Sequence, residues 1–173
     1  MAKTKKVSFK KFKKLPLPRS LSGWILASVE DAKFLSRTRG FRLNMSVFNE
    51  FPQVYNAKKN DYVDGSVCEV CLGGSVLVRR GLVAPGDHTN GDNTSSLGAG
   101  IDSVRAGDLA SSIQHLASSG YLPEWMGGVL PDELQTILAS LGNRILEAMD
   151  GESDRAPWPV YIGVAKELQQ QGL

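Results

Sequence analysis

The segment 131–149 constrains the fold more than any other part of the chain. Its apolar residues recur at helical spacing: Leu134, Ile137, Leu138, Leu141, Ile145 and Met149. A helix with this spacing has one apolar face, which must be buried against other elements. Pro131 suits the first helical turn, and Asp132 and Glu133 complement the helix dipole there. The segment therefore predicts a long amphipathic helix that packs against further helices.

Three other segments have features of helices. Ser28 and Asp31 have the spacing of a capping box, which predicts a helix over 28–39. A second stripe of apolar residues at helical spacing predicts a helix over 108–118. Residues 160–168 form a short apolar segment after a proline-rich break, and we expect them to be helical as well.

The middle of the chain is less regular. Apolar and polar residues alternate over 41–47, which predicts a strand with one buried face. The apolar block 67–82 favours a helix, although Gly73 and Gly74 each cost about 1 kcal/mol there and leave a strand after the glycines as the alternative. The polar, glycine-rich stretch 85–100 predicts a long surface loop. We therefore expect a mainly α fold, with α+β open, and one small β-hairpin or short sheet.

The charge is divided unevenly along the chain. The formal net charge of +2 is the sum of +8 over residues 1–19 and −6 over the remainder. With 173 residues the chain is long enough to bury a sizeable core. We expect a basic N-terminal arm over 1–18 and a single globular domain over 19–173. An arm of this kind is typical of an interaction tail, or of a segment that folds back on an acidic surface.

The N-terminal arm supplies most of the candidate binding residues. Lysines alternate with phenylalanines in it, a mixture suited to contacting phosphates while the rings stack. The residues are Lys5, Lys6, Phe9, Lys10, Lys11, Phe12, Lys13 and Lys14. Three interpretations stay open: a solvated tail with one hydrophobic anchor or an arm docked on protein, a nucleic-acid contact, and a membrane-surface contact.

Trp125 is the other candidate binding residue. It lies between two expected helices and is followed by Gly127 and Gly128, so a loop there can present it as an aromatic anchor. Tryptophan is heavily buried on average, which favours a core position instead.

Cys68 and Cys71 are spaced like the cysteines of a metal or redox site, but the rest of the sequence does not support such a site. Zinc would need about four ligands, and Cys68, Cys71, His88 and His115 are the cysteines and histidines of the whole chain. Their spacing matches no common zinc module, and a redox dithiol would need an accessible first cysteine. We favour two buried cysteines packed on a helix. Because no catalytic constellation is recognisable either, we expect no enzymatic activity and no cofactor.

The sequence also bears on location. No stretch approaches the roughly 18 consecutive apolar residues that span a bilayer, and the prolines in Leu15-Pro16-Leu17-Pro18 break any apolar signal core. Two cysteines are too few for a disulfide framework and fit a reducing compartment. We expect a cytoplasmic protein without membrane contact.

Two segments resemble a family of small uncharacterised proteins from tailed bacteriophages. Residues 67–76 read VCEVCLGGSV, similar to the family's Cys-x-Val-Cys-Leu segment. Residues 97–116 resemble a second segment, in which an Arg-x-Gly-Asp step (105–108) leads into a helix. The resemblance covers roughly residues 60–120 and implies a phage accessory protein in the host cytoplasm.

The resemblance implies a function by binding rather than by catalysis. Such a protein would inhibit or redirect a bacterial host or defence complex, either a protein or a protein–nucleic acid assembly. Its acidic surface would mimic nucleic acid or serve only solubility. The alternative is a nucleic-acid-binding protein that uses the lysines and phenylalanines of the N-terminal arm.

Overall fold

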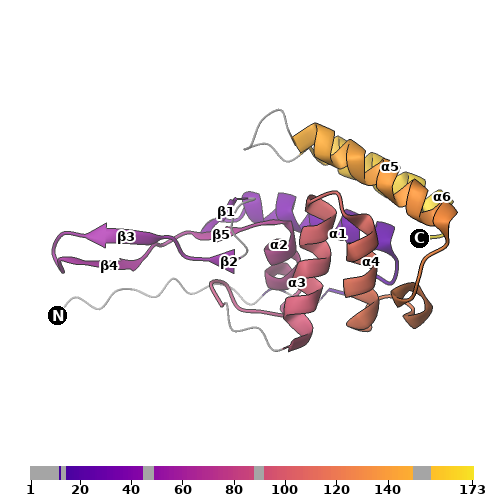
Figure 1. Ribbon diagram of the computed structural model, residues 1–173. Coiled ribbons are helices and arrows are strands. Elements are labelled where there is room, and N and C mark those ends of the chain that lie inside the picture. Colours follow the sequence, from indigo (N-terminus) through magenta and orange to yellow (C-terminus); the bar gives the residue numbers. More distant parts are fainter. Residues whose placement is uncertain (1–11, 13–14, 45–48, 88–91, 150–156) are drawn as a thin grey trace.

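A computed structural model describes residues 12, 15–44, 49–87, 92–149 and 157–173. The fold is mainly α with a small β part, as predicted. The described elements in chain order are α1 (Leu21–Ser36), β1 (Phe41–Leu43), β2 (Asn49–Glu50), β3 (Gln53–Asn56), β4 (Asp61–Asp64), β5 (Cys68–Val70), α2 (Leu72–Arg79), α3 (Asp92–Arg105), α4 (Leu109–Ser118), the 3-10 helix η1 (Glu124–Gly127), α5 (Asp132–Met149) and α6 (Trp158–Gln170) (Figure 1).

Helix α1 begins seven residues earlier than the sequence predicted. Its N-cap is Ser20, whose hydroxyl accepts a hydrogen bond from the Gly23 amide at 3.1 Å. Ser28, predicted as the cap, lies inside the helix, where its hydroxyl donates to the Ile25 carbonyl at 2.8 Å. The capping box over 28–39 was therefore wrong, because a serine inside a helix can bond the preceding turn and no longer marks an end.

A three-stranded sheet precedes α2, and β5 is its central strand. Strand β5 pairs with β1 in parallel and with β2 in antiparallel orientation, and Cys68, Glu69 and Val70 are all buried. The predicted helix over 67–82 is thus a strand in its first part and a helix only from Leu72 to Arg79. A strand buried on both faces has no polar alternation, so a short apolar run does not distinguish it from a helix. The alternative of a strand after the glycines was also wrong, since Gly73 and Gly74 lie in α2.

The loop predicted over 85–100 is helical from Asp92 onward, where α3 begins. Leu97, Ile101 and Val104 are fully buried along one side of this helix. At Gly100 an added Cβ would lie 3.0 Å from the Cγ of Leu116, so the glycine allows α3 and α4 to approach closely. Glycines that serve helix packing had been interpreted as loop residues. Residues 88–91 lie outside the described part.

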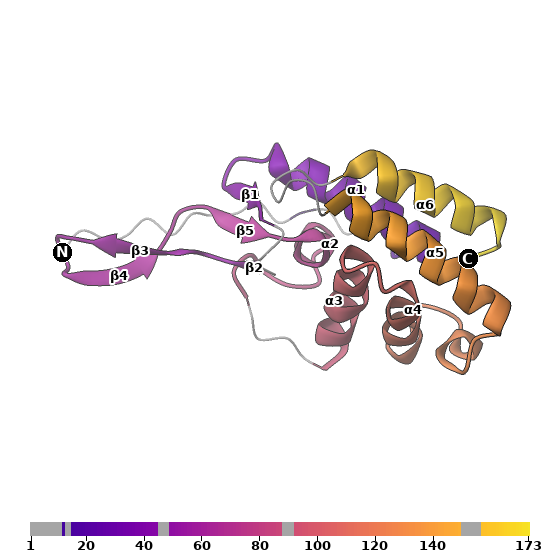
Figure 2. The same cartoon turned by 45° about the horizontal axis from the view of Figure 1, so that its top comes forward.

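The C-terminal helices confirm the sequence predictions. Asp108 caps α4 by accepting a hydrogen bond from the Ser111 amide at 3.0 Å. Helix α6 packs on α1, and α5 lies beside α6 and contacts α3 and α4 beneath it (Figure 2). The main-chain oxygen of Leu173 accepts hydrogen bonds from the Ser22 amide at 3.0 Å and hydroxyl at 2.6 Å, which joins the end of α6 to the start of α1.

The hairpin of β3 and β4 projects from this body on the side opposite α5 and α6 (Figures 1 and 2). It forms a separate two-stranded sheet. The strand predicted over 41–47 corresponds to β1, which covers its first three residues, whereas residues 45–48 lie outside the described part.

Candidate functional site

The projecting hairpin, residues 53–64, is the most exposed ordered element of the described chain. Its turn is held by the Lys59 amide, which donates to the Asn56 carbonyl at 3.0 Å. Asn60 has a φ of 50°, a left-handed conformation that asparagine adopts more readily than most residues. The Tyr55 hydroxyl donates to the Asn60 side-chain oxygen at 2.7 Å. The turn is therefore built by local hydrogen bonds and needs no support from the body.

Both faces of the projecting hairpin carry apolar side chains in water. Tyr55 and Tyr62 are paired across the strands, with ring centroids 5.5 Å apart and 53% and 63% of each residue exposed. Val54 pairs with Val63 one position along, so the valines occupy the opposite face, and Val54 is 52% exposed. Exposed aromatic and β-branched residues on both faces of a thin hairpin form a surface suited to contact with a partner.

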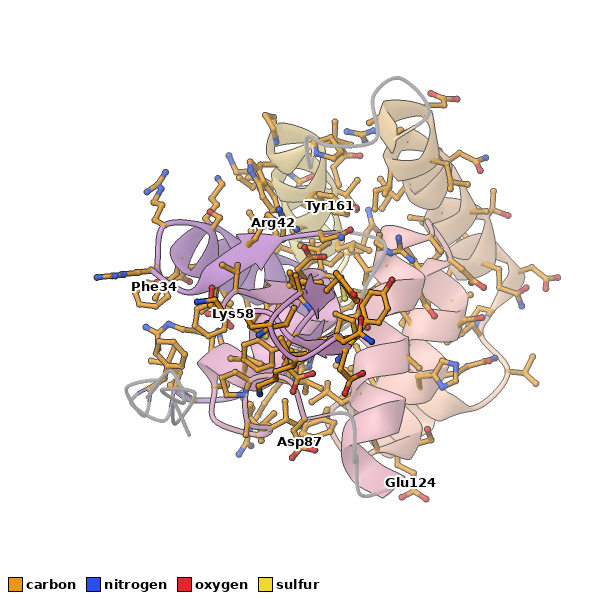
Figure 3. The ribbon with its side chains drawn as sticks, turned by 90° about the vertical axis from the view of Figure 1, so that its left-hand side faces the viewer. Phe34, Arg42, Lys58, Asp87, Glu124 and Tyr161 are labelled. Atoms are coloured by element: carbon orange, nitrogen blue, oxygen red, sulfur yellow. The ribbon has the colours of Figure 1, made fainter. Side chains whose placement is uncertain are left out.

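The charges of the projecting hairpin are balanced. Lys58 and Lys59 lie in the turn, and Asp61 and Asp64 lie on β4. Figure 3 views the molecule with the hairpin toward the reader and Lys58 near the centre of the view. The hairpin itself therefore has no net charge to attract a polyanion.

Phe12 anchors the N-terminal arm on the body. Its ring lies 5.9 Å from the ring of Phe34 and 5.9 Å from that of Phe41. The Arg79 guanidinium lies over the Phe34 ring at 4.0 Å and near the Phe12 ring at 5.4 Å. Of the arm residues predicted to bind, the structure describes Phe12, and it supports the interpretation of an arm docked on protein by a hydrophobic anchor. Those outside the described residues are Lys5, Lys6, Phe9, Lys10, Lys11, Lys13 and Lys14.

A second contact holds the arm at Pro16, which is nearer in sequence to the start of α1 than Phe12 is. The Arg80 guanidinium donates to the Pro16 carbonyl and also to the carboxylate of Asp31 at 2.6 Å. Asp31 lies in the third turn of α1, whereas Ser20 caps its first turn. Pro16 and then Phe12 therefore lie successively further along α1, from Ser20 at its N-terminal end toward Phe34 near its C-terminal end.

The titratable groups with shifted pKa values are all buried. Burial raises the pKa of Asp31 to about 6 against the opposing effect of Arg80. Burial also raises the pKa of the Cys68 thiol to about 11 and that of Tyr161 to about 12. A cysteine with a raised pKa holds little thiolate at neutral pH and is a poor nucleophile. These three groups lie in the packed interior of the described part of the protein.

Among the described residues whose burial is known, Glu69 is the second buried acid, and it is neutralised within the sheet. It pairs with Arg42, and it accepts a hydrogen bond from the Asn44 amide group at 2.6 Å. Arg42 faces Glu69 in the register of β1 and β5, so the positive charge that neutralises the Glu69 carboxylate comes from the neighbouring strand. A carboxylate held in this way fixes strand pairing.

Of the four residues considered for zinc, the structure describes Cys68, Cys71 and His115. Cys68 lies on β5 and donates a hydrogen bond to the Asn49 side-chain oxygen at 3.2 Å, whereas Cys71 caps α2. Both cysteines are buried, as predicted, but neither lies on the helix to which they were assigned. His115 is exposed on α4, and His88 lies outside the described residues. Within the described ranges no cluster of three or more His, Cys, Asp or Glu side chains could hold a metal ion.

Trp125 is exposed, so the core interpretation was wrong for this residue. It is 68% exposed in η1, and Val129 just after it is 96% exposed. Trp24, by contrast, is fully buried in α1. The position of the projecting hairpin was not predicted from the sequence, although Tyr55 and Tyr62 flank the polar run 56–61 symmetrically.

No protein-family model, curated protein or solved structure matches this chain. None of the helices in the described residues is long and apolar enough to cross a membrane.

Proposed function

We propose that this protein is an accessory protein of bacteriophage type that acts by binding a bacterial host or defence complex in the cytoplasm, without catalysis. The observation that carries the proposal is the projecting hairpin, on which Tyr55 and Tyr62 are more than half exposed. Phage origin rests on the resemblance over roughly residues 60–120.

A protein partner fits the projecting hairpin better than a nucleic acid does. A two-stranded hairpin with both faces in water is marginally stable alone, and a partner that covers it would stabilise it. Tyrosine is enriched among residues that dominate protein–protein binding energy. Lys58 and Lys59 are offset by Asp61 and Asp64, so a phosphate backbone would meet repulsion as well as attraction.

The rest of the body is compatible with binding rather than catalysis. Asp31 and Glu69 are buried against arginines, and the Cys68 thiol is buried with a raised pKa. Residues 88–173 contain eleven acidic and four basic residues, so this half would repel nucleic acid and could occupy a basic groove on a partner.

The test is a nuclease-treated pull-down from bacterial lysate with three full-length chains. The wild type and the Trp125→Ala variant should capture the same stoichiometric protein, while Tyr62→Ala should lose it. Trp125→Ala is the matched control, because it also removes an exposed aromatic residue but lies outside the hairpin. Capture that is equal for all three chains would refute docking through the hairpin.

The alternative function is nucleic-acid binding through the N-terminal arm. One observation favours it: Phe12 docks beside Arg79, and lysines flank Phe12 in the sequence. Fluorescence anisotropy with a labelled single-stranded oligonucleotide would then show binding that weakens steeply with salt and disappears when residues 1–18 are deleted. Absence of binding at low salt would exclude this alternative.

A further inference from the structure

A second exposed surface lies far from the projecting hairpin, around η1. We call it the Trp125 surface; its residues are Glu124, Trp125, Val129, Asp132 and Glu133, all exposed. Met126 and Leu130, which alternate with the exposed apolar residues, are buried in the core. The loop is further held by the Gln135 side chain, which donates to the Leu130 carbonyl at 2.7 Å. The backbone is therefore anchored while Trp125 and Val129 face water.

The charge around this surface has one sign. Residues 121–143 contain three acidic residues, which are Glu124, Asp132 and Glu133, and no lysine or arginine. An aromatic anchor and an exposed valine within an acidic rim are complementary to a segment that combines lysines with apolar side chains. The N-terminal arm of this protein has that composition, because residues 1–11 contain five lysines together with Val7 and Phe9.

The arm starts at the end of α1 that lies away from the Trp125 surface, so a second copy can present that surface without the arm turning back along α1. Pro16 and Phe12 lie successively nearer the C-terminal end of α1, as the contacts of Pro16 with Arg80 and of Phe12 with Phe34 establish. The Trp125 surface follows Tyr121, which packs edge-on against Trp24 in the first turn of α1 with ring centroids 5.4 Å apart. A 16-residue helix, about 24 Å long, therefore separates the two positions. Phe34 and Glu124 lie on opposite sides of the view in Figure 3.

We propose that residues 1–11 of one copy dock on the Trp125 surface of a second copy, joining the basic end of one molecule to the acidic end of the next. The surfaces in contact are different on the two copies, so the association is head-to-tail and can continue to a third copy. Attraction between lysines and acids at the rim makes it sensitive to salt. This association does not depend on the proposed function of the projecting hairpin.

Sedimentation velocity of nuclease-treated full-length protein at low salt tests the proposal. The weight-average sedimentation coefficient of the wild type should rise with protein concentration and fall when salt is added. Trp125→Ala should weaken the association about thirtyfold, the loss typical of an aromatic hot spot. Removal of residues 1–11 should leave a monomer. Tyr62→Ala is the matched control and should associate like the wild type, even though it removes an aromatic residue of similar exposure.

A mixing experiment distinguishes the head-to-tail arrangement from other modes. The Trp125→Ala chain keeps an intact arm, and the chain without residues 1–11 keeps an intact Trp125 surface. Mixed at a concentration at which each alone is monomeric, they should form a 1:1 heterodimer that does not grow further. A wild type that stays monomeric at every concentration, or a mixture that forms no heterodimer, would overturn the proposal.

Discussion

The Asp31 carboxylate and the Arg80 guanidinium are joined at 2.6 Å inside the protein, although 49 residues separate them in the chain. Both residues are buried. Arg80 also donates to the Pro16 carbonyl, so this one cation ties α1, the end of α2 and the base of the N-terminal arm together. Removing one partner of a buried pair leaves an uncompensated charge, so the pair specifies this arrangement even if its net contribution to stability is small.

Asp31 should make stability depend on pH. Its pKa is raised from an ordinary 3.8 to about 6, so between these values the folded protein binds a proton that the unfolded chain has released. The free energy of unfolding therefore falls as pH rises through this window, by about 3 kcal/mol for this group. Urea denaturation at pH 4.5 and pH 7, compared between wild type and Asp31→Asn, isolates the effect because other carboxyl groups titrate in both proteins. The stability advantage of the wild type should be larger at pH 4.5.

The opposite slope would be informative. If the advantage of the wild type grows toward pH 7, the attraction of Arg80 outweighs the burial of Asp31, and the pKa of the carboxyl group is lowered in the folded protein.

Gly142 and Gly163 should respond in opposite ways to the same substitution. An added Cβ at Gly142 in α5 would lie 1.9 Å from the carbonyl oxygen of Gly107, so alanine would push α5 away from the turn between α3 and α4. At Gly163 in α6 the Cβ would meet the Arg144 side chain at 3.5 Å, an ordinary contact. Gly163→Ala should stabilise the protein by up to about 1 kcal/mol through helix propensity, whereas Gly142→Ala should destabilise it by about 1–3 kcal/mol. Urea denaturation measures both, and a stabilising Gly142→Ala would contradict the close approach.

The elements that were predicted correctly are those with local signals. Helix α5 has an apolar stripe over five turns, and α4 has Asp108 at its cap, so neither needs information from distant residues. Strand β5 was missed because its identity comes from pairing with β1 and β2, which are distant in sequence. Helix α3 was missed because its glycines were taken for loop residues, although Gly100 serves the contact with Leu116.

The candidate site was predicted only in part, for a similar reason. Trp125 was identified from its flanking glycines, and Phe12 from its place among lysines. That Tyr55 and Tyr62 share one face depends on strand register, and that the hairpin stands clear of the body depends on the whole fold. Exposure of this kind is a tertiary property, which no local pattern encodes.

Cys68 should be inert toward thiol reagents in the folded protein. The thiol is fully buried and its pKa is raised to about 11, so both access and thiolate content are low at pH 8. Ellman's reagent should therefore react with Cys68 in native Cys71→Ala protein far more slowly than in the same protein in urea. Rapid reaction under native conditions would show that β5 opens easily.

Added zinc should not raise the melting temperature of the wild type, since the described residues bring no histidine to the two cysteines.

Replacing residues 53–64 by Asn-Gly should remove the projecting hairpin without unfolding the body. The Gly65 amide already donates to the Pro52 carbonyl at 2.9 Å, which is the hydrogen bond that closes a two-residue turn, and Asn-Gly is the preferred sequence for such a turn. Strands β3 and β4 pack chiefly on each other, so the free energy of unfolding should change by less than about 1 kcal/mol. Leu77→Ala in the core is the reference for a destabilised body and should lower the free energy of unfolding by about 2–5 kcal/mol.

Urea denaturation checks stability, and the pull-down of the shortened chain checks function. A shortened chain that is as stable as the wild type and no longer binds the partner would assign the contact to the hairpin, whereas a loss as large as that of Leu77→Ala would mean that the hairpin supports the body after all.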